Sequence, residues 1–100
     1  MGSQTRKLAE LRAKTDHQLL NLLNFQLERG FEYARLMEEA HAAGQRAEME
    51  QWHAHAYEAY CEASRLASMS PKTLESQRLN AALDRLRAFV EPAPAQAACF

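Results

Sequence analysis

The scarcity of helix-breaking residues most limits what this chain can fold into. Among 100 residues there are 3 glycines and 3 prolines, and between Gly2 and Pro71 only Gly30 and Gly44 are of either type. Alanine, leucine, glutamate, arginine and glutamine dominate, whereas valine, isoleucine and threonine are scarce. These residues favour helices and disfavour strands. The sequence therefore predicts an all-α fold.

The few helix-breaking and helix-capping residues divide the chain into three predicted helices, at about 16–43, 45–68 and 71–90. Thr15, with Gln18 three residues later, has the spacing of a capping box. Gly44 can adopt the left-handed conformation that ends a helix. Ser70 is a good N-cap, and Pro71 then fills the first helical position, where its missing N–H costs nothing. The Pro-rich stretch after Val90 ends the third helix.

Each predicted helix carries an apolar stripe at helical spacing, which favours a packed bundle over isolated helices. The connections at Gly44 and at residues 69–70 are short, so consecutive helices are antiparallel neighbours. We therefore expect an up-down-up three-helix bundle. The stripe of the first helix is Leu20, Leu23, Leu27, Gly30, Ala34 and Met37, widened by Leu22, Phe31, Tyr33 and Leu36.

The two ends of the chain lie outside this pattern. Residues 1–14 form an amphipathic segment with Leu8 and Leu11 on its apolar side. It either prolongs the first helix beyond the bundle or folds back as a short fourth helix, and the cap signals at Thr15 favour a break there. We thus divide the chain into the segment 1–14, a bundle domain over 15–90 and an extended Pro/Ala tail over 91–100.

The charges are balanced, with 12 basic and 13 acidic residues and a formal net charge of -1. No overall field then attracts the chain to nucleic acid or to anionic lipid. A basic cluster near the N-terminus is interleaved with Glu10 and Asp16, and consists of Arg6, Lys7, Arg12 and Lys14. Such mixed surfaces are usually solvated. We expect neither nucleic-acid nor membrane binding.

The two cysteines occupy unlike places, since Cys61 falls within a predicted helix and Cys99 is the penultimate residue. A disulfide framework is not expected from this pattern, and a reducing compartment follows. The N-terminus has no apolar run of signal-peptide type. The sequence therefore predicts a soluble, cytoplasmic protein.

Two Glu-x-x-His units, Glu38 to His41 and Glu50 to His53, flank the turn at Gly44. Residues three apart project from one helix face, so each unit can offer a carboxylate and an imidazole to a metal ion. Folding at Gly44 brings Glu48 level with His41. A divalent metal site is therefore an alternative prediction, although the third helix offers no further inward carboxylate.

Other chemistry has weaker signals. His53 and His55 are two residues apart and point about 200° apart on a helix, so they cannot share an ion. We expect His53 to lie at a helix interface. No Gly-rich phosphate loop is present in the sequence, and no acid and base occupy facing positions as an enzyme requires. We therefore expect no enzymatic activity and no cofactor.

The most economical function is a non-enzymatic interaction or assembly module. The apolar arc on the first helix is wide, and the amphipathic segment before it has no assigned place in the bundle, so these surfaces require a partner. The partner would be a second copy of the chain or another helical protein. The expected interface residues are Leu8, Leu11, Leu22 and Phe25.

Overall fold

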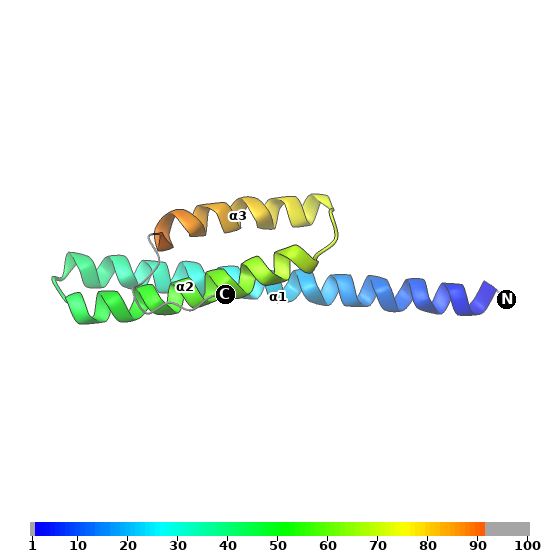
Figure 1. Ribbon diagram of the computed structural model, residues 1–100, viewed down its shortest axis with the longest axis horizontal. Helices are drawn as coiled ribbons and strands as arrows, with labels where there is room; N and C mark the ends of the chain where they lie inside the picture. Colours follow the sequence, from blue (N-terminus) through cyan, green and yellow to red (C-terminus); the bar gives the residue numbers. More distant parts are fainter. Residues whose placement is uncertain (1, 92–100) are drawn as a thin grey trace.

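The computed structural model describes the backbone of residues 2–91 and the side chains of residues 11 and 14–91. It contains α1 (Gly2–Ala42), α2 (Arg46–Met69) and α3 (Leu74–Val90). Helices α1 and α2 run antiparallel side by side, and α3 lies along the pair in the direction of α1 (Figure 1). The predicted up-down-up three-helix bundle is confirmed.

Helix α1 continues without a break through Thr15, where we expected the chain to break. The Thr15 hydroxyl donates a hydrogen bond to the carbonyl of Leu11 at 2.9 Å. Its oxygen therefore serves the preceding turn of the same helix and does not cap a new one. The other alternative is observed: the N-terminal segment prolongs the first helix, which begins at Gly2. The N-terminal part of α1 extends beyond α2 and α3 (Figure 1).

The turn between α1 and α2 is built on Gly44, as predicted. Gly44 has a φ of 71°, which side-chain-bearing residues rarely adopt. The Gly44 amide donates to His41 O at 3.1 Å, and the Gln45 amide donates to Ala40 O at 2.9 Å. These bonds satisfy carbonyls that the end of α1 leaves without helical partners, so the reversal needs no longer loop.

Helix α3 begins three residues later than predicted, with Thr73 as its N-cap. Thr73 and Ser76 form a reciprocal capping box, in which each side chain accepts a hydrogen bond from the other's backbone amide. Ser70, the predicted N-cap, instead ends α2 by donating from its hydroxyl to Leu66 O at 2.8 Å. Pro71 and Lys72, between these two caps, form a short linker, and Leu74 is 77% exposed. The predicted end of α3 at Val90 is confirmed.

The core is formed where the apolar stripes of the three helices meet. Its largest fully buried side chains are Leu23 on α1 with Leu86 and Val90 on α3. Helix α2 contributes small residues, Ala56 and Ala63, which permit a close approach of its neighbours. The buried cluster consists of Leu23, Leu27, Ala34, Ala56, Ala63, Leu66, Leu83, Leu86 and Val90.

Gly30 sets the spacing between α1 and α3. It is buried, and a methyl group at this position would overlap Leu86 Cδ2 and lie 3.3 Å from Leu86 Cδ1. Leu86 is itself fully buried, so a displacement of its side chain would disturb other core contacts. The absence of a side chain at Gly30 therefore allows Leu86 to pack directly against the α1 backbone.

We predict that Gly30→Ala lowers the free energy of unfolding by about 1 kcal/mol, because overpacking outweighs the gain in helix propensity. Urea unfolding measures the change. Leu86→Ala alone should cost about 2–5 kcal/mol through the cavity it leaves. In the double variant the added methyl group occupies part of that cavity, so the combined loss should be smaller than the sum. Strict additivity would contradict the close contact.

Candidate interaction surface

Large apolar side chains lie in line on the side of α1 that faces away from the core. Leu11 is 60% exposed, Leu22 is 51% exposed and Phe25 is 52% exposed. They belong to one series with alternating intervals of three and four residues, which we call the outer row: Leu11, Thr15, Gln18, Leu22, Phe25 and Arg29. Leu8 precedes the row at the same spacing, but its side chain lies outside the described residues.

The position of the outer row follows from which face of α1 is buried. At about 100° per residue, the row lies about 150° around the helix from the stripe that contains Leu20, Leu23 and Leu27. That stripe is buried against the other helices. Leu22 was expected to widen the buried stripe, but it is exposed, whereas Phe31 and Tyr33 pack against the core. Helices α2 and α3 therefore leave the outer row uncovered.

Arg29 links the end of the outer row to a group of aromatic rings. Its guanidinium lies 5.7 Å from the ring centroid of Phe25 and 5.6 Å from that of Tyr33. Its Nη2 also donates to the Tyr33 hydroxyl at 2.9 Å. These contacts restrict the side chain of Phe25 even though its ring is half exposed. Sequence reasoning missed this arrangement, although the i, i+4 spacing of residues 25, 29 and 33 could have indicated it.

The aromatic group continues across the boundary between α1 and α2. Tyr33 stacks on Trp52 with a centroid distance of 5.8 Å, and His55 lies 5.4 Å from Tyr33 and 5.8 Å from Trp52. Trp52 is thus a boundary residue, half-buried between the helices, and it is absent from the buried cluster. Such rings combine apolar area with a polar edge, as is common at protein interfaces.

Charged residues bound the apolar part of α1 on its C-terminal side. Arg35 forms exposed ion pairs with Glu32 and Glu39. The hydrogen bond from Arg35 lowers the pKa of Glu32 below its usual value, and the same bond raises the pKa of Arg35. Position 32 continues the spacing of the outer row, so the row passes from apolar side chains into ionised ones after Arg29.

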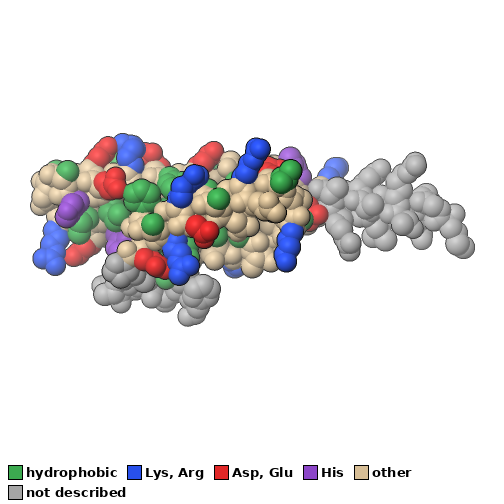
Figure 2. Space-filling model, turned by 90° about the horizontal axis from the view of Figure 1, so that it is seen from above, with side chains coloured by type: hydrophobic (Ala, Val, Ile, Leu, Met, Phe, Trp, Pro, Cys, Tyr) green, Lys and Arg blue, Asp and Glu red, His purple; other side chains and the backbone are tan. Residues whose placement is uncertain are grey.

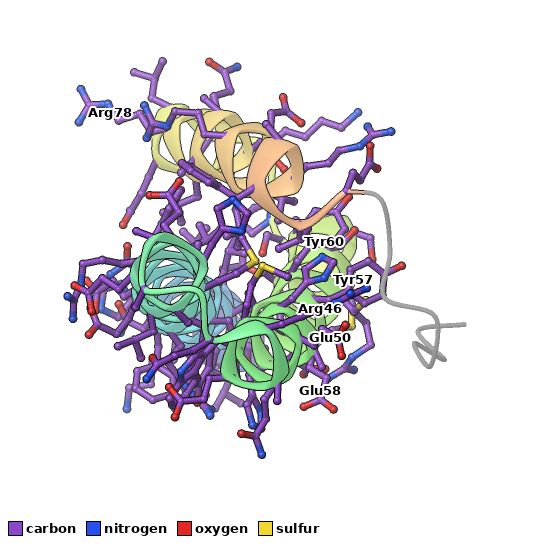
Figure 3. The ribbon with its side chains drawn as sticks, turned by 90° about the vertical axis from the view of Figure 1, so that its left-hand side faces the viewer. Arg46, Glu50, Tyr57, Glu58, Tyr60 and Arg78 are labelled. Carbon is purple, nitrogen blue, oxygen red and sulfur yellow. The ribbon has the colours of Figure 1, made fainter. Side chains whose placement is uncertain are left out.

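The structure does not bring the predicted metal ligands together. Glu38 and Glu48 are exposed, and Glu50 pairs with Arg46 at 3.4 Å on the outer side of α2 (Figure 3). His41 Nδ1 lies 3.2 Å from the sulfur of Met49. Within the described part of the chain, no three His, Cys, Asp or Glu side chains are grouped so as to hold an ion. The arrangement therefore does not favour the metal-binding alternative.

His53 lies at a helix interface, as expected. Its Nε2 lies 2.7 Å from the carbonyl oxygen of Val90, the last residue of α3, and donates a hydrogen bond to it. The last carbonyls of a helix have no partner within that helix. His53 therefore caps α3 from a neighbouring helix and ties its end to α2.

Cys61 departs from the prediction for the cysteines. It is disulfide-bonded, so the expectation that the chain forms no disulfide is wrong at this position. That expectation rested on the unlike places of the two cysteines in the sequence, one within a predicted helix and one next to the C-terminal residue, and such places do not report distance in the folded chain. The reducing compartment inferred from free thiols consequently has no support from Cys61.

No family model matches the chain, and neither a curated protein nor a solved structure does. Within the described residues, none of the helices is both long and apolar enough to cross a membrane.

We predict that His53→Ala lowers the free energy of unfolding by about 1 kcal/mol, because the carbonyl of Val90 loses its donor. Hydrogen exchange should quicken in the last turn of α3. His17→Ala is the matched control, since His17 is exposed on α1. Equal unfolding free energies for the two variants would show that the bond does not hold the end of α3.

Proposed function

We propose that this protein is a non-enzymatic helical interaction module whose outer row docks on a helix of a second copy or of another protein. One observation carries the proposal: Leu11, Leu22 and Phe25 are each at least half exposed and lie along one face of α1. Single exposed apolar residues are normal on protein surfaces. The three residues belong to a row whose positions recur at intervals of three and four residues, which is the pattern of a helix-packing seam.

The extension of α1 beyond the bundle supports the same proposal. Its N-terminal part has no neighbouring helix among the described residues (Figure 1), and short helices without tertiary contacts are marginally stable in water. A partner helix would supply the missing contacts. On the face of the bundle that Figure 2 shows, hydrophobic side chains are interspersed with charged ones.

The composition of the surface next to the outer row also suits an interface. Aromatic residues and arginine are enriched where protein interfaces derive most of their binding energy. On α1, Arg29 contacts both Phe25 and Tyr33 within the single chain. Because these side chains are already restricted, docking would cost less conformational entropy than ordering free side chains.

Substitutions in the outer row test the proposal. Leu22→Glu alone, and Leu8→Glu together with Leu11→Glu, should each abolish association, because a carboxylate in an apolar seam loses its hydration. The mass in solution by light scattering, and the proteins retained by the immobilised chain, are the measurements. Circular dichroism should show unchanged helix content, since exposed substitutions usually alter stability within about 0.5 kcal/mol.

Leu74→Glu is the matched control, because Leu74 is more exposed than Leu11, Leu22 or Phe25 and lies on α3. It should leave both the mass and the retained proteins as they are for the unaltered chain. The proposal fails if the outer-row variants behave like this control.

A further inference from the structure

We propose that the outer row docks on the outer row of a second copy with the two α1 helices antiparallel, so that Leu11 faces Leu22 of the second copy. This inference rests on the proposed function, and it specifies the partner, the direction and the register. Three independent properties of α1 support it: the spacing of the row, the placement of its charges and the extent of the bundle along it.

With position 8 added at its N-terminal end, the outer row has the same spacing in both directions as far as Phe25. Positions 8, 11, 15, 18, 22 and 25 are separated by three, four, three, four and three residues. Two such rows running in opposite directions place position 8 opposite 25, 11 opposite 22, and 15 opposite 18. Apolar residues then face apolar residues in the outer layers, and Thr15 faces Gln18 in the two central layers.

Other antiparallel registers lose this match. A shift of one heptad in one direction places Leu11 opposite Arg29, and in the other direction it places Leu11 opposite Thr15. The register with Leu11 opposite Leu22 is therefore favoured over both. Polar residues at central positions of a helical seam lower affinity but fix register. Thr15 and Gln18 are exposed in the single chain, so they are available for this role.

The charges favour the antiparallel direction. A parallel pair in register would place Arg29 directly against Arg29 of the second copy, and would place position 7 beside position 12, where both residues are basic. The antiparallel pair separates these like charges. It also brings the basic position 7 beside Glu28, which is exposed and accepts a hydrogen bond from Asn24 at 3.2 Å. Opposite charges at such flanking positions set the orientation of paired helices.

The shape of the molecule favours the same direction. Helices α2 and α3 flank the C-terminal part of α1 and leave its N-terminal part as an extension (Figure 1). In the antiparallel pair, each extension lies along Leu22 and Phe25 of the other copy and is supported by that copy's bundle. The core faces of both α1 helices point away from the seam, so α2 and α3 do not obstruct it. A two-fold axis between residues 16 and 17 relates the two copies.

Charged pairs that distinguish the two directions test the inference. Leu11→Glu and Leu22→Lys should each make the full chain monomeric when alone, because each places two unpaired charges in the seam. Mixed together, they should form a heterodimer, in which one layer pairs the introduced charges and the other retains two leucines. Its affinity should exceed that of either variant for itself by about tenfold or more, measured by analytical ultracentrifugation.

The matched control is a mixture of Leu11→Glu with Leu11→Lys. In a parallel pair these two charges would face each other and restore the dimer, whereas in the antiparallel pair each faces Leu22 and association stays lost. If the control mixture forms a dimer, or if neither mixture forms one, the proposed arrangement is overturned.

A second variant does not depend on introducing charges. Thr15→Leu with Gln18→Leu should tighten the dimer by about tenfold or more, because the two polar central layers become apolar. An unchanged or weaker dimer would contradict the register. An unaltered chain that remains monomeric throughout a dilution series would overturn self-association alone. The proposed function would then be decided separately by whether Leu22→Glu removes a retained partner protein.

Discussion

Both shorter helices bury their apolar stripes against the same face of α1, and this shared burial organises the rest of the molecule. Gly30 permits the contact with α3, since the fully buried Leu86 occupies the space that a side chain at Gly30 would need. Because one face of α1 receives both neighbours, the opposite face has no helix against it among the described residues. The greater length of α1 likewise leaves its N-terminal part without a neighbouring helix in the described part of the chain. The exposed apolar row follows from the first of these facts and the helical extension from the second.

Local interactions and one contact between helices fix the ends of the helices. Gly44 reverses the chain, Thr73 and Ser76 begin α3, and His53 caps its end at Val90. His53 belongs to the second Glu-x-x-His unit, and in the fold it forms this cap. Its imidazole is directed at a helix terminus, and Glu50 pairs with Arg46 on its own helix. His53 and Glu50, which were candidate metal ligands, thus take part in contacts within the fold.

The side chains beside the outer row make contacts with one another within the single chain. Arg29 holds Phe25 and Tyr33 together on α1, and Tyr33 joins Trp52 across the helix boundary. An interface built on such residues loses little side-chain freedom on docking. In the arrangement that we propose, a second copy complements the outer row, because each apolar position has an apolar counterpart at the same distance from the two-fold axis.

The sequence by itself determined the helical class, the turn at Gly44, the end of α3 at Val90 and the antiparallel order of the helices. These features depend on residue propensity and on spacing within a few turns, which the sequence displays directly. Only the tertiary structure decided that Thr15 lies inside a helix, that Thr73 and not Ser70 caps α3, that Leu22 faces outward and that Cys61 is disulfide-bonded. At Thr15, the tendency to cap a new helix competes with continuation of the same helix. The apolar stripe of α1 is wider than the neighbouring helices can cover, so the sequence alone does not tell which part of it is buried. These outcomes depend on contacts with helices from distant parts of the sequence, and a local sequence pattern does not contain that information.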